Sequence, residues 1–410
     1  MKSASPWHDK TLLSICVAQT LLMMGMGFLS PILPKFVQAL GVTSTQIGTM
    51  VGLVITAYGV GRAVMCLPTA RLAKHFGRRP LLIIGPALVA INTLAMGLAT
   101  AYWQLVMFRL FQGLAATVFS VTAMIVTGEI STPANRGQYM SLYFGSLFIG
   151  ASLGPSLGGF VGQYLGYRAT FFCFAGLASV ATLWNYLRIP ETKANQLPAI
   201  SKTLDNIPTQ NSSKKQIPLY KDLSFVLISM VTLVTLITIT GNQITLIPLL
   251  GYERLNLMEG QVGLTLGLVA ILQFAFVFLA GSLSDKLGRK ALIVPGGIVT
   301  ALGLALFTQS RSYRSFLLSS AVLGIGRGFG SAVPSAYIAD IASPRDYEHT
   351  LALYRTAGDI GGVIGPLLLG WLKDVSGLDS PFFLSAGLLF VTVILFAIFA
   401  RETVGRSASR

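Results

Sequence analysis

The chain has 410 residues, of which 53% are hydrophobic and only 11% are charged. A soluble protein carries about 25% charged residues, so this composition excludes a soluble multidomain enzyme and indicates an integral membrane protein. The formal net charge of +15 would indicate nucleic-acid binding in a soluble protein. Here the distribution of basic residues between loops, described below, accounts for the charge without a nucleic-acid partner.

Twelve apolar runs follow one another along the chain. A helix needs about 20 apolar residues to span a bilayer, and helices are the expected spanning form because lipid satisfies no backbone polar group. The sequence therefore predicts an all-α integral membrane protein with twelve transmembrane helices. The predicted helices lie near residues 11–34, 46–68, 80–100, 102–128, 137–162, 168–188, 223–250, 260–283, 290–310, 313–341, 350–372 and 380–401.

A polar stretch from Ile189 to Asp222 separates the sixth run from the seventh. It is rich in proline, serine and lysine, a composition typical of linkers. We therefore expect a six-helix bundle in residues 1–188, a cytoplasmic linker in 189–222 and a second six-helix bundle in 223–410.

Basic residues are distributed unevenly between the two sides of this topology. With both termini inside, the inner segments hold 20 of the 30 Lys and Arg residues, the outer loops hold six and the helices hold four. Because cytoplasmic loops are enriched in Lys and Arg, this ratio predicts cytoplasmic termini. A bacterial inner membrane is the expected location, with an organelle envelope as the alternative.

The two halves repeat each other at an offset of 211 residues. Residues 142–159 align with 353–370, and eight of these 18 positions are identical. Such halves indicate two pseudo-symmetric bundles, the design of secondary transporters whose site lies between the halves. The same offset aligns Gly77, Arg78 and Arg79 with Gly288, Arg289 and Lys290, and Glu129 with Asp340.

The loop between the eighth and ninth runs, Gly281 to Lys290, combines glycine, aspartate and basic residues, and each type has a physical role there. Glycine allows a tight turn, Asp285 can face the positive N-terminus of a neighbouring helix, and the basic residues can face anionic lipid or an acidic helix end. The first-half copy has Ala70 in place of glycine and Lys74 in place of the aspartate. A lysine does not favour a helix N-terminus, so we expect a weaker contact there.

Two further motifs lie within helices. Arg109 and Gln112-Gly113 have the spacing Arg-x-x-Gln-Gly, and the fifth run holds closely spaced glycines around a proline. Small residues allow close helix approach, and the proline can act as a hinge. The hinge candidates are Gly150, Gly154, Pro155, Gly158 and Gly159, with Gly365 and Pro366 in the second half.

With the loop signature, these motifs resemble the major facilitator superfamily over all twelve helices, and most of all its twelve-helix drug:proton antiporter branch. The resemblance implies a transporter, with Arg109 assisting proton movement and the glycine–proline motif associated with antiport.

The repeat distinguishes charges kept in both halves from charges present in one. Glu129 and Asp340 are kept near the basic loops, so we interpret them as acid–base latches that can break and reform when the bundles rock. The predicted latch residues are Lys74, Gly77, Arg78, Glu129, Asp285, Gly288, Arg289 and Asp340.

Charges within helices that lack a repeat partner are better candidates for function, because charges at membrane depth usually line a cavity or pair with each other. Asp359 is the one acid placed well inside a predicted helix, and Arg355 lies four residues earlier on the same face. Two interpretations stay open: an ion pair that stabilises the helix, or a proton or substrate site. The proton-coupling candidates are Asp359, Arg109 and Arg355.

Four intramembrane arginines against one aspartate leave a positive interior, which favours an anionic or neutral substrate. Each polar candidate for the cavity could equally bridge two helices. The substrate-cavity candidates are Arg62, Arg327, Tyr58, Asn92, Gln112, Asn185, Asn242, Gln243 and Gln273.

The sequence therefore predicts a monomeric transporter, not an enzyme, that exports a small, largely apolar organic compound in exchange for protons by alternating access. No phosphate-binding loop occurs, and no cofactor, metal or catalytic residue is expected; protons, substrate and membrane lipids are the expected partners. The alternative is an organic-anion or metabolite transporter working by uniport or symport. A non-transporting membrane sensor is the remote alternative.

Overall fold

The computed structural model describes residues 9–132, 135–189, 222–331, 333–342 and 347–403. Helices form at all twelve predicted runs. The first six are α1 (Lys10–Ala39), α2 (Ile47–Phe76), α3 (Arg78–Gly97), α4 (Tyr102–Ile130), α5 (Arg136–Leu165) and α6 (Tyr167–Arg188). The others are α8 (Leu223–Ile237), η4 (Thr238–Leu246), α9 (Ile247–Glu253), α10 (Glu259–Leu287), α11 (Lys290–Thr308), α12 (Tyr313–Ser331), α13 (Val333–Ile341), α14 (Tyr347–Ser376) and α15 (Ser380–Phe399).

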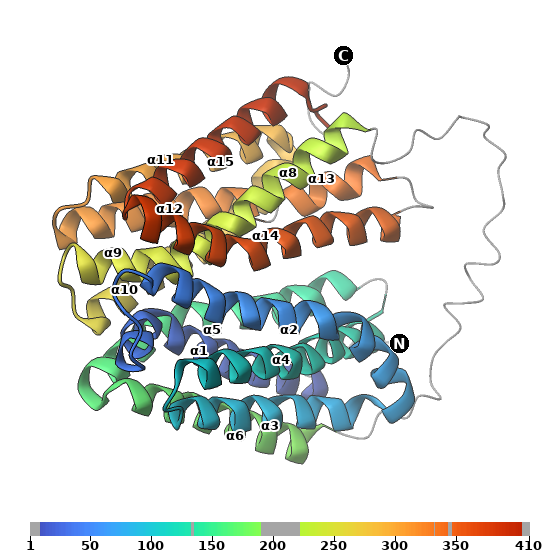
Figure 1. Cartoon of the computed structure of the whole chain (residues 1–410). Helices are drawn as coiled ribbons and strands as arrows, with labels where there is room; N and C mark the ends of the chain where they lie inside the picture. The colour runs from blue at the N-terminus through green and yellow to red at the C-terminus, as the bar shows by residue number, and fades with distance from the viewer. Residues whose placement is uncertain (1–8, 133–134, 190–221, 332, 343–346, 404–410) are drawn as a thin grey trace.

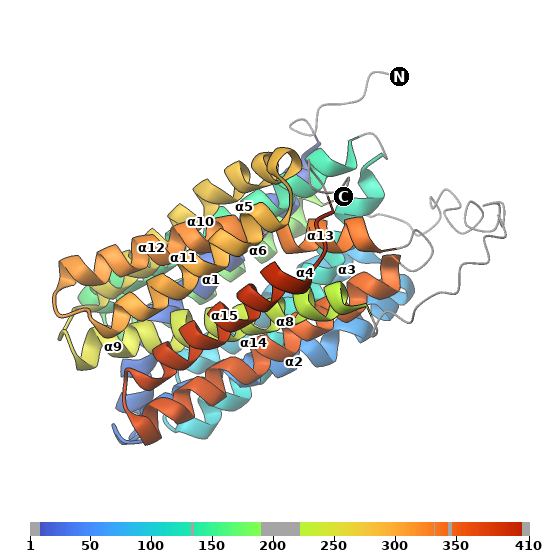
Figure 2. The same cartoon turned by 90° about the horizontal axis from the view of Figure 1, so that it is seen from above.

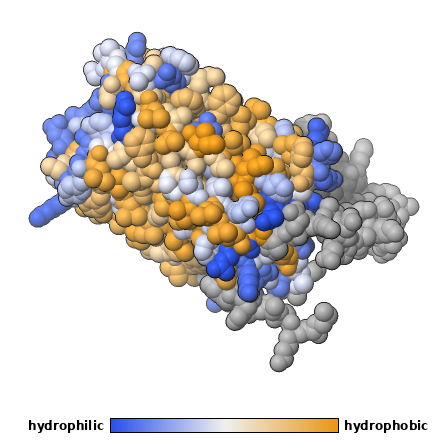
Figure 3. Space-filling view, turned by 90° about the horizontal axis from the view of Figure 1, so that it is seen from below, coloured by the Kyte–Doolittle hydropathy of each residue, from blue (hydrophilic) through white to orange (hydrophobic). Residues whose placement is uncertain are grey.

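Eleven helices in the described part of the chain are long and apolar enough to cross a membrane, with α8, η4 and α9 forming one span and α12 and α13 another. The remaining predicted run, the eleventh, at 350–372, forms the 30-residue helix α14. A broad apolar band covers the side of the molecule, and hydrophilic residues gather toward its two ends (Figure 3). The chain is therefore an all-α, multi-pass membrane protein, as the sequence predicts.

The helices form two bundles, α1–α6 and α8–α15, which lie side by side (Figure 1). Two helix pairs carry most of the contact between the bundles, α5 with α10 and α14 with α2 (Figure 2). Most of the predicted linker, residues 190–221, lies outside the described residues, so its boundaries stay a prediction.

Both helix pairs between the bundles contain a close contact between a glycine and a proline carbonyl group. A Cβ atom on Gly263 of α10 would lie 2.3 Å from the carbonyl oxygen of Pro155 in α5, and one on Gly52 of α2 would lie 2.2 Å from that of Pro366 in α14. Gly52 and Gly263 are 211 residues apart, and so are Pro155 and Pro366. The internal repeat thus builds a pseudo-symmetric interface, in which each bundle places a proline carbonyl against a glycine of the other.

These contacts lie toward one end of the molecule. We call it the far end, because α1 begins and α15 ends at the opposite, terminal end (Figure 1). Polar groups complete the closure of the far end. Lys35 Nζ of α1 lies 2.7 Å from Glu259 Oε1 of α10, and Asp374 of α14 accepts hydrogen bonds from the backbone N–H groups of Gly48 and Thr49 at 3.0 and 2.7 Å. Asp374 thereby caps the first turn of α2 across the interface.

Toward the terminal end, the same helix faces are exposed. On α2, the face that holds Gly52 and Gly59 continues to Leu67, which is 78% exposed. On α14, the face that holds Pro366 and Val363 continues to the exposed Asp359. The bundles are thus packed together at the far end and separated at the terminal end.

Candidate functional site

Arg109 lies in a buried polar cluster inside the first bundle. Its Nη1 donates to Gln112 Oε1 at 3.1 Å and contacts Met26 Sδ at 3.7 Å. Gln112 Nε2 donates to Thr93 Oγ1 at 2.7 Å, and the ring centre of Tyr58 lies 5.8 Å from the guanidinium carbon. Three predicted candidates therefore meet in one place. Thr93 was missed, because it carries no charge that would mark it in the sequence.

Arg327 lies in a second buried cluster, inside the other bundle. Its Nη1 donates to the Gln243 side-chain oxygen, and its Nη2 donates to the carbonyl oxygen of Thr238 at 3.2 Å. Both partners belong to η4, a nine-residue π-helix. Gln273 of α10 lines the same small cavity as Arg327. Three more candidates are thus brought together, at a wide helical turn of the kind often found at functional sites.

The two buried arginines occupy related places in the repeat. They are 218 residues apart, seven more than the offset of 211, and seven residues are about two helical turns. Each therefore projects from the same face of its helix, at a different depth. Arg109 is 3% exposed and Arg327 is 2% exposed, and each has an Nε without a hydrogen-bond partner. No ion pair reaches either guanidinium from the described residues.

Asp359 and Arg355 are both exposed, and no ion pair or hydrogen bond joins them in the described structure. The interpretation that they pair to stabilise the helix therefore does not hold in this conformation. Asp359 instead lies one helical turn beyond Val363, whose backbone oxygen accepts a hydrogen bond from Thr56 of α2 at 2.7 Å. The carboxylate is thus at the point where α2 and α14 separate. Arg62 is also exposed, on α2.

Two of the three asparagine candidates join neighbouring helices. Asn185 bridges α6 to α3 by donating to Leu82 O at 2.7 Å, and Asn242 bridges η4 to α15 by donating to Ser385 Oγ at 2.8 Å. Asn92 donates to Leu88 O of its own helix. Asn185 and Asn242 thus follow the alternative that the sequence left open, a bridge between two helices, whereas the amide of Asn92 donates within its own helix.

The predicted latch pair of the first bundle is formed. Arg78 Nη2 lies 2.7 Å from Glu129 Oε1, and Arg78 Nη1 donates to Ala73 O at 3.2 Å. The turn before it needs Gly77, which has a φ of +86°. Lys74 is exposed in the last turn of α2, where a cation suits the negative end of a helix.

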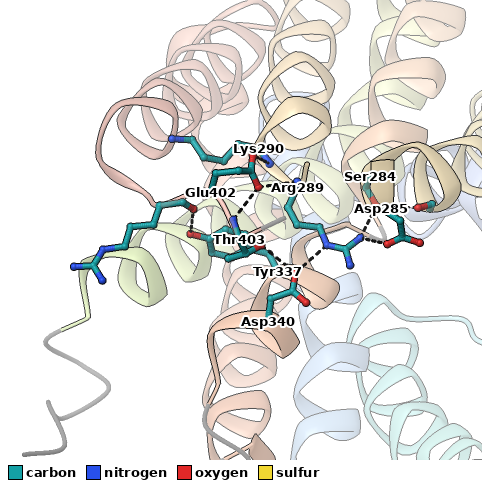
Figure 4. Close-up of polar contacts among 10 residues, drawn as sticks. Ser284, Asp285, Arg289, Lys290, Tyr337, Asp340, Glu402 and Thr403 are labelled. Atoms are coloured by element: carbon teal, nitrogen blue, oxygen red, sulfur yellow. Dashed lines mark hydrogen bonds and ion pairs between the residues drawn. The ribbon is translucent and has the colours of Figure 1, made fainter. Parts of the chain in front are cut away.

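The latch of the second bundle centres on Arg289 (Figure 4). Its Nη1 lies 2.5 Å from Asp285 Oδ1, and its Nε lies 3.0 Å from Asp340 Oδ2. Burial would lower the pKa of Arg289, but the hydrogen bonds to Asp340 and Asp285 outweigh it and raise that pKa. Gly288, with a φ of +105°, makes the turn into this loop.

The carboxylate at the start of α11 is Glu402 (Figure 4). Glu402 accepts hydrogen bonds from the backbone N–H groups of Arg289 and Lys290 at 2.9 and 3.1 Å. Asp285 is drawn to the guanidinium of Arg289 instead, because a full positive charge attracts it more than a helix end does. The internal repeat could have marked Glu402 as a candidate, because a glutamate, Glu191, occupies the equivalent position in the first half, 211 residues earlier.

The hinge candidates of α5 divide between two neighbours. Gly150, Gly154 and Gly158 lie against the backbone of α1, where an added Cβ would come within 2.4 Å of Thr20, Met24 and Phe28 respectively. Gly159 and Pro155 instead meet α10 of the other bundle. In α14, Gly365 packs on the backbone of Ile237 in α8, and Pro366 meets α2. The motif thus fixes helix spacing within a bundle and contact between bundles.

Comparison with known proteins agrees with this architecture. The family model of the Major Facilitator Superfamily matches residues 15–256 and 228–409. An uncharacterized MFS-type transporter of Methanocaldococcus jannaschii is 24% identical over 380 residues, covering 92% of this chain and 95% of that protein. The class H tetracycline resistance protein of Pasteurella multocida is 23% identical over 397 residues, covering 95% of this chain and 96% of that protein.

Among solved structures, a D-xylose–proton symporter has the same fold, with a TM-score of 0.76 and 16% identity over 96% of this chain and 98% of the symporter. The match to the family model, over both halves of the chain, identifies the protein as a membrane transporter that belongs to the major facilitator superfamily.

Proposed function

We propose that the protein exports a small, largely apolar organic compound in exchange for protons, by alternating access. The observation that carries this proposal is the pseudo-symmetric interface, closed at the far end by proline–glycine contacts and separated at the terminal end. Such an interface can rock, because the same contact type recurs on both sides of the pseudo-symmetry axis. The similarity to a tetracycline resistance protein supports a drug-like substrate.

The orientation follows from the distribution of basic residues. We propose that both termini are cytoplasmic and that the membrane is a bacterial inner membrane, because the loops at the terminal end carry most Lys and Arg residues. The structure then corresponds to the inward-open state, ready to accept substrate from the cytoplasm. Closure of the terminal end and opening of the far end would complete the cycle, with a monomer as the working unit.

For proton coupling we propose Asp359, assisted by Arg355 and Arg109. Asp359 lies on the face of α14 that turns toward α2, just beyond the last close contact between the two helices. In this position a carboxylate is reachable from the cytoplasm in the inward-open state. It would be enclosed when α2 and α14 come together at the terminal end, which is the change in environment that a coupling acid requires.

The alternative, an organic-anion or metabolite transporter, is favoured by one observation. Arg109 and Arg327 are buried charges without a carboxylate partner in the described part of the chain. A positive interior attracts anions.

Reconstituted liposomes with an internal pH dye test both candidates. Under an imposed proton gradient, lipophilic cations, neutral drugs and organic anions are added in turn. Proton movement opposite to substrate movement supports antiport, and co-directional movement supports symport.

The matched variants for this assay are Asp359→Asn and Asp359→Glu. The first should abolish proton-coupled flux while leaving folding intact, and the second should retain it because the acid remains. Normal pH-driven flux in Asp359→Asn would rule out Asp359 as the coupling acid.

A further inference from the structure

We propose that the cavity beside Arg327, inside the second bundle, binds a compact anionic group. The group is either a carboxylate carried by a transported compound or a free inorganic anion such as chloride. The carboxylate case rests on the proposed transport function, whereas the inorganic case does not.

The cavity is small and partly polar. It has a volume of about 30 Å³ and lies among α8, η4, α10, α11, α12 and α15. A water-sized group needs about 10–15 Å³ on the same measure, so the cavity has room for two or three such groups and none for a whole drug molecule. Polar side chains in its wall are Thr235, Gln273, Thr300, Arg327 and Ser331.

The charge in the wall of this cavity is uncompensated. Arginine stays protonated in proteins, so Arg327, at 2% exposure, brings a full positive charge into the bundle. Its two bonded nitrogens reach neutral acceptors, a glutamine oxygen and a backbone carbonyl, and its Nε has no partner. Leaving a buried charge without a counter-charge costs several kcal/mol in general, so an anion placed here would be stabilised strongly.

The remaining wall offers further donors. The Gln273 amide makes no hydrogen bond to another described side chain or backbone group, although it lines the cavity. Ser331 is exposed, so the wall of the cavity reaches the surface of the bundle at this residue. An anion beside Arg327 would therefore have the guanidinium and an amide N–H group as potential donors, and hydrogen bonds of this charge-assisted kind are the strong ones.

Arg109 provides an internal comparison, because it is an equally buried arginine in the first bundle. There Met26 and Gln112 occupy the guanidinium, and Tyr58 covers it with its ring. The aromatic face and the sulfur supply part of the compensation that an anion would give. Only the Arg327 cluster combines an uncompensated guanidinium with a cavity among the sites described above.

The test is chloride binding by the full-length protein in detergent, followed by the broadening of the ³⁵Cl NMR signal of sodium chloride. Wild type should broaden the signal, and Arg327→Gln should weaken the apparent affinity by about tenfold or more, since it removes a charge-assisted hydrogen bond. Arg311→Gln is the matched control, an exposed arginine on the same bundle, and should behave as wild type. Sodium benzoate is then added as a carboxylate competitor.

Displacement of chloride by benzoate, with Arg327-dependent uptake of labelled benzoate into liposomes, assigns the site to a substrate carboxylate. Arg327-dependent chloride binding without benzoate displacement assigns it to a resident inorganic anion. Equal broadening by wild type, Arg327→Gln and Arg311→Gln overturns the proposal. Should Arg327→Gln misfold, Gln273→Leu decides, since unchanged chloride affinity in that variant also overturns it.

Proton-coupled flux of a drug is measured on the same preparation. Drug flux without anion binding refutes this inference and leaves the proposed function standing. Anion binding without flux of any compound supports this inference and refutes the proposed function.

Discussion

Adding one methyl group at Gly263 should force open the far end of the transporter. A Cβ atom there would lie 2.3 Å from the carbonyl oxygen of Pro155 and 3.1 Å from the Cα of Gly159. Real Cβ contacts are not shorter than about 3.0 Å, so α5 and α10 would have to move apart by at least about 0.7 Å. Both neighbours are backbone atoms, which cannot rotate away as a side chain does.

Overpacking of this kind costs about 1–3 kcal/mol. Because the contact exists while the far end is closed and is lost when it opens, the cost falls on the closed state. The ratio of far-end-open to far-end-closed molecules should then rise about 5–150-fold. Gly52→Ala, the repeat-related change, should shift the ratio in the same direction, because its Cβ would lie 2.2 Å from Pro366 O.

Cysteine accessibility measures this shift. In a background without Cys16, Cys66 and Cys173, a cysteine is placed at Thr56, in the other helix pair, so that it reports opening of the whole end. A membrane-impermeant maleimide should then label the Gly263→Ala protein faster than the parent protein.

Gly145→Ala is the matched control, since an added Cβ there meets no atom within 4 Å. Labelling at Thr56→Cys that stays the same in Gly263→Ala and Gly145→Ala would refute the reasoning that this contact holds the far end closed.

Three other changes have defined outcomes. Asp374→Asn should also speed labelling at the far end, because the hydrogen bonds to the N–H groups of Gly48 and Thr49 lose their charged acceptor, a loss of about 1–2 kcal/mol. Equal labelling rates in Asp374→Asn and the parent protein would contradict this. Glu402→Gln should weaken the cap of α11 and so reduce the free energy of unfolding by about 0.5–2 kcal/mol, which lowers the melting temperature. An unchanged melting curve would argue against a capping role. Pro155→Ala should slow turnover with little change in substrate affinity, and wild-type turnover would count against a hinge.

Much of the architecture was predictable from the sequence, because the determining physics is local. Each apolar run must become a helix of membrane length in lipid, whatever its neighbours are. The repeat also predicted which acid meets which base. Arg78 lies beside Glu129 and Arg289 lies beside Asp340, because each acid is 51 residues after its base in both halves.

Partner choice across helices depended on the tertiary structure. Asp359 and Arg355 share a helix face, yet they do not pair in the described structure, because both lie exposed where the bundles separate. Glu402 caps the start of α11 although it lies 113 residues away along the chain. Such outcomes depend on distances between atoms that are far apart along the chain, and periodicity within one helix contains no information about them.

The sequence by itself determined the twelve helices, the pseudo-symmetric halves and the family, because hydrophobic length and repetition are properties of contiguous residues. Only the tertiary structure decided which end of the interface is closed, where η4 widens into a π-helix, and that Arg327 meets neutral acceptors beside a cavity. The physical reason is that burial, and with it the cost of a charge, is set by the packing of helices against one another.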